Sequence, residues 1–149
     1  MKLRRYKDGD GKKLYELFYD VVHIINAKDY SKEQLDAWAP LEFDLKKWNQ
    51  SFLDHFTVVA VEEEIIVGFG DIDKSGYLDR LYAHKDFQRR GIGSKIVKEL
   101  EKMADSNIIT HASITAKPFF EKMGYKVIKE QQVLRKGVYL TNFIMEKSI

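Results

Sequence analysis

The sequence has no cysteine, only two prolines and no long uninterrupted apolar run. The lack of cysteine excludes disulfides, thiolate metal sites and a cysteine nucleophile, and it fits a reducing compartment. Without an apolar stretch of about 20 residues, we expect no membrane-spanning helix. The basic residues near the N-terminus are not followed by an apolar segment, so we expect no secretory signal and a cytoplasmic location.

An excess of charge of one sign is also missing. The 25 basic and 23 acidic residues leave a formal net charge of +2. Because nucleic-acid-binding proteins usually carry a clear basic excess, we expect no nucleic-acid partner. The four histidines show no pair at the spacing of metal ligands, so we expect no metal. A length of 149 residues with 44 % hydrophobic residues predicts a single domain over residues 1–149.

The first third of the chain is predicted to be mainly helical. Apolar residues at helical spacing indicate a helix over residues 14–22. A capping box that starts at Ser31 predicts a short helix over residues 31–38, which Pro40 stops. Asp44 is placed to cap a third helix over residues 45–52.

The rest of the chain alternates between strand and helix patterns, with Glu62-Glu63-Glu64 as a hairpin turn. The expected strands cover residues 2–6, 57–61, 65–72, 76–84, 107–112, 125–129 and 138–145, and the expected helices cover residues 91–103 and 115–123. Helices followed by an antiparallel meander, a βαβ unit and a last hairpin predict a mixed α/β sheet.

One strand-to-helix turn has the composition of a phosphate site. The predicted helix begins within Gly91-Ile92-Gly93, and Arg89, Arg90 and Lys95 place positive charge at the same end. Glycines let the backbone approach a ligand closely, and the free N–H groups of a first helical turn favour an anion. A nucleoside-triphosphate loop would need Gly-Lys-Ser/Thr and a dinucleotide fingerprint a third glycine, and both are missing. We therefore expect a pyrophosphate site of another kind.

Two sequence blocks resemble the GNAT acetyltransferase superfamily. The first is Gln88-x-x-Gly91-x-Gly93 after a Leu-Tyr-Ala strand, and the second is Ala116-x-x-Phe119-Phe120-Glu121-Lys122-Met123-Gly124-Tyr125. The resemblance extends from about Phe56 to the C-terminus. It implies a GNAT-like acyl-CoA N-acyltransferase fold, in which helices flank a twisted and mostly antiparallel central sheet. It also implies acetyl-CoA as co-substrate and direct transfer of its acetyl group to a primary amine of a small molecule or peptide.

The resemblance further implies which residues bind the cofactor. In this superfamily the strand before the loop splays from its neighbour, and the pantetheine arm pairs with the exposed backbone. The implied cofactor-binding residues are Leu81, Tyr82, Ala83, Arg89, Arg90, Gly91, Ile92, Gly93, Ser94, Ser113 and Phe120. For Ser113, a role as a helix cap before Ala116 remains an alternative.

The reaction needs a group that takes a proton from the acceptor, because an amine with a pKa near ~10.4 is protonated at neutral pH. Asp79 is the first candidate for this general base. Tyr77 stands where some relatives have a strand glutamate, and Asp79, two residues on, points to the same face. Asp71 and His111 remain further alternatives, as does a chain of water molecules.

A proton donor for the leaving thiol is less clear, because relatives use a tyrosine where this chain has Phe120. Tyr82, Tyr125 or Tyr139 could substitute, or the thiolate could leave unassisted. We therefore name Asp79, Tyr77 and Tyr125 as catalytic candidates. The missing tyrosine also keeps open a different function, a non-catalytic module that binds or senses acetyl-CoA.

The N-terminal helices are expected to supply the acceptor pocket. Together with Asp71 and Asp79, a set of N-terminal residues could attract and enclose a cation there: Asp36, Trp38, Glu42 and Trp48. We favour the simpler interpretation that the two tryptophans belong to the core and that the acids are solvated. The last strands also offer a surface through which a homodimer could form.

Overall fold

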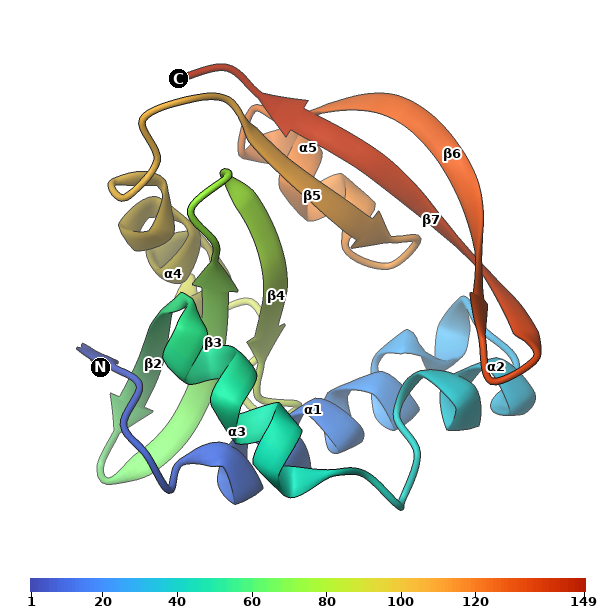
Figure 1. The fold of residues 1–149 in the computed structure, drawn as a ribbon, viewed down its shortest axis with the longest axis horizontal. Coiled ribbons are helices and arrows are strands. Elements are labelled where there is room, and N and C mark those ends of the chain that lie inside the picture. The colour runs from blue at the N-terminus through green and yellow to red at the C-terminus, as the bar shows by residue number, and fades with distance from the viewer.

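A computed structural model describes residues 1–149 and contains one seven-stranded sheet in the order β1-β2-β3-β4-β5-β7-β6 (Figure 1). Neighbouring strands are antiparallel except for the parallel pair β4 and β5. The strands are β1 (Lys2–Arg5), β2 (Phe56–Glu62), β3 (Ile65–Ile72), β4 (Tyr77–Ala83), β5 (Ile108–Ser113), β6 (Lys126–Arg135) and β7 (Val138–Lys147). The predicted mixed and mostly antiparallel sheet is confirmed.

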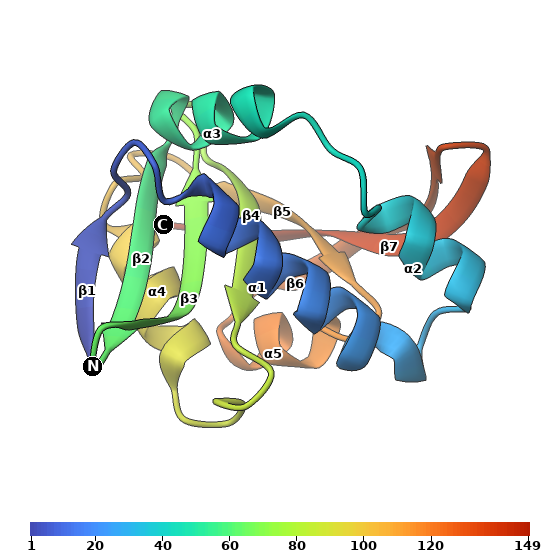
Figure 2. The same cartoon turned by 90° about the horizontal axis from the view of Figure 1, so that it is seen from below.

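Helices cover both faces of this sheet (Figure 2). They are α1 (Gly11–Ile24), the 3-10 helix η1 (Asn26–Lys28), α2 (Lys32–Trp38), α3 (Leu45–Asp54), α4 (Ile92–Glu101) and α5 (Lys117–Lys122). The expected caps are present, because the Ser31 side chain forms a full capping box and Asp44 accepts the Lys47 N–H at 3.1 Å. None of the helices combines the length and the apolar character needed to cross a bilayer.

Two hydrophobic cores lie on the two faces. The core under α4 and α5 includes Ile96, Leu100 and Phe120, whereas the core under α1 and α3 includes Leu14 and Phe52. The strand β2 serves both, since successive side chains of a strand point to opposite faces and its buried valines divide between the cores. Burial of these apolar side chains is the main force that holds the helices on the sheet.

A β-bulge interrupts the alternation in β4. Asp71 of β3 pairs with Arg80, but Ile72, the next residue, pairs with Leu78, so Asp79 has no partner of its own. As a result Tyr77, Asp79, Arg80 and Tyr82 all reach the face that carries α1 and α3. Leu78, between Tyr77 and Asp79, packs into the opposite core.

The strands β4 and β5 separate along their length. Their pairing is limited to Tyr77 with Ile109 and Leu78 with Thr110, and beyond this point the two strands diverge (Figure 1). From Asp79 to Ala83, one edge of β4 therefore has no neighbouring strand, while its other edge still pairs with β3. This opening in the middle of the sheet positions the site described below.

The last hairpin is longer than the pattern predicted. The strand β6 continues to Arg135 instead of ending at Lys129, and it pairs with β7 over this whole length. The side chains of β6 are mostly exposed. The polar run at Glu130, Gln131 and Gln132 therefore did not indicate a strand, although it belongs to an ordinary edge strand. A strand with little apolar content on either face leaves no strong alternation to detect.

Candidate functional site

The loop between β4 and α4 is held in shape by its own backbone and by Gln88. Arg89 has φ 61° and Gly91 has φ 77°, both in the left-handed region. The Gln88 side-chain amide donates to the carbonyl oxygens of Ala83 at 2.6 Å and His84 at 3.1 Å. Gln88 of the Gln-x-x-Gly-x-Gly pattern thus ties the loop back to the end of β4.

The first turn of α4 offers a cradle for an anion. Its hydrogen bonding begins with the Lys95 N–H donating to the Gly91 carbonyl oxygen at 3.1 Å, so the N–H groups of residues 92–94 have no partner within the helix. A β-carbon on Gly93 would lie 3.3 Å from the Phe119 ring, so a side chain would fill this space. Arg89 and Arg90 are exposed beside it. Free N–H groups, a helix start and two cations fit a pyrophosphate.

A cavity of about 210 Å³ lies beside the separation of β4 and β5. It is bounded by side chains of α1, α2, α3, β4, β5, β6 and β7, which makes it the place where the helical N-terminal third meets the last hairpin. Its lining is rich in aromatic and polar side chains: Phe18, Tyr30, Trp38, Trp48, Tyr77, Asp79, Arg80, Tyr82, His111, Ser113, Val133, Arg135, Leu140, Thr141 and Asn142.

Asp79 and Tyr77 both line this cavity, so they lie on the same face of the sheet, as their spacing predicted. The Asp79 side chain is 35 % exposed, so its carboxylate is reachable from the cavity. Burial, followed by the negative charge of Asp71, raises the pKa of Asp79 above its ordinary value. Burial also raises the pKa of Tyr77 to about 12, which keeps its hydroxyl protonated at neutral pH. The pair therefore combines a carboxylate that can accept a proton with a hydroxyl that can only donate one.

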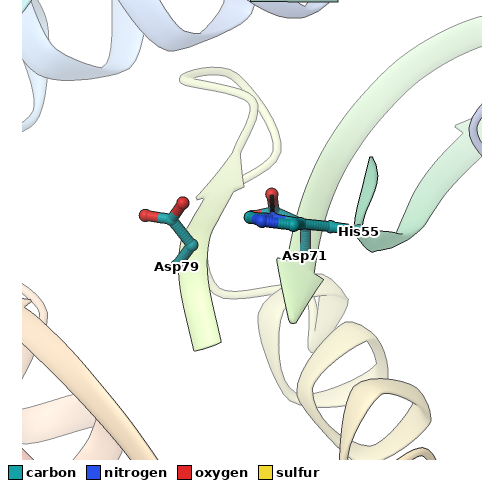
Figure 3. A group of neighbouring side chains, drawn as sticks. All are labelled: His55, Asp71 and Asp79. Atoms are coloured by element: carbon teal, nitrogen blue, oxygen red, sulfur yellow. Dashed lines mark hydrogen bonds and ion pairs between the residues drawn. The ribbon is translucent and has the colours of Figure 1, made fainter. Parts of the chain in front are cut away.

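Asp71 and His55 lie beside Asp79 (Figure 3) and form a buried ion network with Arg80. Asp71 is fully buried, and its carboxylate accepts from the backbone N–H of Arg80 at 2.9 Å, from the Arg80 guanidinium and from His55 Nδ1 at 2.8 Å. The Arg80 guanidinium stacks 3.9 Å from the centre of the Phe52 ring. Asp71 is thus occupied and shielded, and the alternative that it acts as the base is not supported.

The same three groups, His55, Asp71 and Asp79, have potential ligand atoms within 4.8 Å of one another. A cation bound there would displace or face the guanidinium of Arg80, which already bonds to Asp71. The Arg80 guanidinium supplies the positive charge that these carboxylates need, so the donor set fits an ion-pair network better than a metal site.

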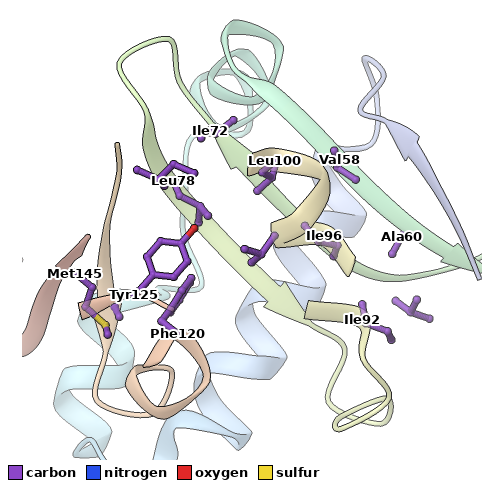
Figure 4. Packing of buried hydrophobic residues seen from close by; sticks show 14 residues of the cluster. Val58, Ala60, Ile72, Leu78, Ile92, Ile96, Leu100, Phe120, Tyr125 and Met145 are labelled. Carbon is purple, nitrogen blue, oxygen red and sulfur yellow. The ribbon is translucent and has the colours of Figure 1, made fainter. Parts of the chain in front are cut away.

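The three alternative tyrosines lie in very different places. Tyr82 lines the cavity, and burial raises its pKa. Tyr125 is 2 % exposed in the opposite core, where it donates to Glu101 at 2.8 Å (Figure 4). Tyr139 is 61 % exposed and does not line the cavity. The structure therefore does not bring Tyr125, one of the three catalytic candidates, to Asp79, because its ring faces α4 on the other side of the sheet.

The remaining predicted positions divide between backbone and side-chain roles. Ile92 and Phe120 are both 3 % exposed, and their side chains belong to the core (Figure 4). Their side chains are therefore not available to contact a cofactor. Ser113 lines the cavity and accepts the Ala116 N–H at 3.0 Å. The cap position of α5 is Ala116, without a side-chain cap, so Ser113 holds the turn before the helix and is not the helix cap. His111 lines the cavity, and burial lowers its pKa.

The two N-terminal tryptophans both line the cavity and belong to the core. Trp38 and Trp48 line the cavity and pack against the core under α1 and α3, and Trp48 Nε1 donates to the Gly11 carbonyl oxygen at 2.8 Å. Asp36 instead bonds to Lys32 on the surface at 2.8 Å, and Glu42 is exposed outside the cavity. The acids of this segment are therefore solvated, as favoured.

The sequence analysis missed the contributions of Tyr30, Arg135, Thr141 and Asn142 to the cavity. The last three belong to the β6–β7 hairpin, and without the full length of β6 it could not be known that this hairpin reaches the cavity. Tyr30 donates its hydroxyl to the Thr141 carbonyl oxygen at 2.6 Å and accepts the Ile114 N–H at 2.9 Å. A capping-box start at the next residue was its only local signal.

Comparisons with known proteins agree with this geometry. The model of the acetyltransferase (GNAT) domain family matches residues 26–147. The "Uncharacterized N-acetyltransferase YafP" of Escherichia coli (strain K12) is 35 % identical over 97 % of this chain and 94 % of its own length. A GCN5-related N-acetyltransferase from Rhodopseudomonas palustris superposes with a TM-score of 0.96 at 31 % identity, covering 99 % and 95 % of the two chains. The PaiA N-acetyltransferase of Thermoplasma acidophilum, solved with coenzyme A, shares the fold, with a TM-score of 0.79 at 20 % identity over 99 % and 98 %.

Proposed function

The chain belongs to the GNAT acetyltransferase family, and from this premise we propose that it transfers the acetyl group of acetyl-CoA to a primary amine of a small molecule or peptide. One observation carries the proposal. The unpaired edge of β4 from Asp79 to Ala83 runs from the cavity to the cradle at Gly91 and Gly93, so one continuous track joins a phosphate site to a reaction site.

The track suits the parts of acetyl-CoA in order. The first turn of α4, with Arg89 and Arg90, would hold the pyrophosphate. The free N–H and C=O groups of Leu81 and the N–H of Ala83 would bond to the pantetheine amides as an added strand does, while the Ala83 carbonyl oxygen accepts from Gln88. Because the track ends beside the cavity, the acetyl end would face Asp79.

Acetyl-CoA supplies a thioester, whose carbonyl carbon forms a bond to the acceptor nitrogen while the carbon–sulfur bond breaks and the sulfur takes up a proton. In this proposal Asp79 accepts the proton that the protonated amine must lose. Because the pKa of Asp79 is raised, it differs less from the pKa of the amine than the pKa of an ordinary carboxylate does, which favours proton transfer. Tyr77 and Tyr82, both protonated at neutral pH, are the hydroxyl donors that face the same cavity.

A second function, binding of acetyl-CoA without transfer, is favoured by one observation only. Phe120, where relatives have a tyrosine, is buried in the core and carries no proton to donate. Such a module would bind acetyl-CoA but release no CoA when amines are added.

A thermal melt with and without acetyl-CoA tests the cofactor site. Ligand at about 100 times its dissociation constant should add ~2.7 kcal/mol to the unfolding free energy, a rise of roughly 5–10 °C for this size of chain. Gly93→Glu should abolish the rise, since its side chain meets Phe119 and brings a negative charge to the pyrophosphate. Ser148→Glu adds the same charge at an exposed position and should keep the rise. No rise in the parent protein would contradict the proposal.

Release of free CoA in the presence of primary amines then separates the two functions. Catalysis predicts amine-dependent release with formation of an N-acetyl product, measured by thiol titration and mass spectrometry. Binding of acetyl-CoA with no release across a broad amine panel would instead support the non-catalytic module.

A further inference from the structure

Three charged side chains other than histidine line the cavity, and one of them is already neutralised. Asp79, Arg80 and Arg135 are these three. The Arg80 guanidinium bonds to the fully buried carboxylate of Asp71, so its charge is compensated within the protein. The Arg80 guanidinium also lies 3.9 Å from the Asp79 carboxylate, which stays 35 % exposed. A ligand in the cavity therefore meets one accessible anion, Asp79, and one cation without an acidic partner, Arg135.

Arg135 has no acidic partner. It lies at the end of β6, where its guanidinium donates only to the carbonyl oxygen of Leu134, at 3.2 Å. No carboxylate oxygen lies within 4 Å of it, in contrast to Arg4 with Asp10 at 2.8 Å. An arginine at a cavity without a partner retains the planar donor set that binds a carboxylate in bidentate fashion.

Tyr77 and His111 are both influenced by the charges of Asp79 and Arg135. Their rings are 5.1 Å apart at the wall of the cavity. After the dominant effect of burial, Asp79 raises the pKa of Tyr77 while Arg135 lowers it, and the same two opposing influences act on the pKa of His111. Both side chains are thus within the electrostatic reach of both charges, which places an acidic and a basic pole on one small cavity.

The size and lining of the cavity restrict what can bridge these poles. A volume of about 210 Å³ is below the ~300–1,000 Å³ typical of drug-sized ligands. Six aromatic side chains surround the poles: Phe18, Tyr30, Trp38, Trp48, Tyr77 and Tyr82. A polyamine or a lysine-rich peptide would bring a second positive charge towards Arg135, whereas a molecule with one amine and one carboxylate would pair with both poles.

We propose that the acceptor is a small amino carboxylate, whose amine lies at Asp79 and whose carboxylate binds Arg135. The inference rests on the proposed acetyl transfer and names its substrate class. Arg135 is in this view a residue that determines specificity, because it touches the part of the acceptor that does not react.

Matched pairs of acceptors test the proposal. The pairs are γ-aminobutyrate with propylamine, 5-aminopentanoate with butylamine, and L-leucine with 3-methylbutylamine, and spermidine serves as a polycation. For each compound the rate of CoA release is measured at saturating acetyl-CoA in the parent protein, in Arg135→Ala and in Arg135→Lys. Lys129→Ala removes a cation from the same strand outside the cavity and serves as the control.

The decisive quantity is the ratio of kcat/KM between an amino carboxylate and its matched amine. We expect the parent ratio to exceed the Arg135→Ala ratio by at least about tenfold, the size of a lost charge-assisted contact. Arg135→Lys should fall between them, and Lys129→Ala should match the parent. The proposal is overturned if the ratio is unchanged in Arg135→Ala, if spermidine or the simple amines are preferred, or if no amino carboxylate is acetylated. CoA release with the simple amines or with spermidine would show that acetyl transfer holds and that only the substrate class is wrong. No release with any compound, with the thermal shift retained, would mean that the proposed transfer itself fails, so the two failures can be told apart.

Discussion

The two faces of the sheet present their functional groups in different ways. On the face with α4, the groups that would hold acetyl-CoA are backbone N–H groups and an unpaired strand edge, over an apolar core that includes Ile92, Ile96 and Leu100. On the face with α1 and α3, the cavity is made of side chains from seven elements, and a buried ion network supports it. One face would bind its ligand mainly through backbone groups, the other mainly through the identity of its side chains.

This difference explains what each face tolerates. A backbone site depends on a few positions where a side chain would crowd a neighbour or where φ is positive, such as Gly93 and Gly91. A side-chain site can change its specificity by exchanging one residue while the fold stays the same. We therefore expect substitutions in the cavity to alter the acceptor reaction and to leave acetyl-CoA binding unchanged, and the predictions below test that separation.

The largest effect is expected from Asp79→Asn. The amide keeps the shape of the side chain but accepts no proton, so amine-dependent CoA release should fall by about 10²- to 10⁴-fold. In the parent, the acidic limb of the pH profile of kcat/KM should lie above the ordinary carboxyl pKa, because burial and Asp71 raise the pKa of Asp79. The thermal shift with acetyl-CoA should persist. Asp105→Asn, an exposed change outside the cavity, is the control; equal activity in the two variants would break the assignment.

The next effect concerns stability on the same face. Asp71→Asn leaves the guanidinium of Arg80 without its buried counter-charge, which should lower the unfolding free energy by about 3–5 kcal/mol. Asp79→Asn, on the exposed side of the network, should change it by less than about 1 kcal/mol. Urea unfolding of both variants measures the difference.

A double variant shows whether the lost charge is the cause. Asp71→Asn combined with Arg80→Met removes both charges and should recover part of the loss, since a buried apolar side chain needs no partner. If the double variant is less stable than Asp71→Asn alone, stacking of Arg80 on Phe52 and Trp48 outweighs the cost of leaving its charge unpaired.

The candidate phosphate loop could be predicted from sequence because its residues are contiguous. The positive φ at Gly91 and the Phe119 ring close to Gly93 both favour glycine, so the motif can be read directly from the order of residues. The helix caps at Ser31 and Asp44 were predictable in the same way, because a cap involves residues only three apart.

The acceptor face could be predicted only in part. Asp79 and Tyr77 could be identified as candidates because they lie two residues apart on one strand and so share a face. A β-bulge then brings Arg80 to the same face, and the sequence spacing alone does not reveal this bulge. Tyr125 was placed wrongly, since its position at the end of the second sequence block does not show which face of the sheet its ring takes. Arg135 was missed because it reaches the cavity through pairing of β6 with β7.

A moderate effect is expected where the helical segment meets the hairpin. Tyr30→Phe removes a hydroxyl that donates to the Thr141 carbonyl oxygen and accepts the Ile114 N–H, both far away in sequence. The loss should lower the unfolding free energy by about 1–3 kcal/mol, because two backbone groups lose a partner. Tyr139→Phe, at 61 % exposure, should change it by at most about 0.5 kcal/mol. If both variants are equally stable in urea, the Tyr30 hydroxyl does not hold the cavity wall.

The smallest effect separates two histidines of the acceptor face by the direction of their titration. The hydrogen bond with Asp71 raises the pKa of His55, so the folded state binds the proton more tightly and its contribution to stability, complete below about pH 6.5, is lost as pH rises through the folded pKa. Burial lowers the pKa of His111, so its penalty is present at low pH and disappears as pH rises through about 6.5.

Unfolding free energies from pH 5 to 8 should therefore change in opposite directions when the two residues are replaced. In His55→Gln the curve should lose a component that falls with pH, so its slope becomes more positive than that of the parent above about pH 6.5. In His111→Gln it should lose a component that rises with pH, so its slope becomes less positive below that value. The deviations have opposite signs because His55 has a carboxylate within hydrogen-bonding distance and His111 has none. Deviations of the same sign would mean that Asp71 does not hold the proton on His55, and the buried network would then need another source of its stability.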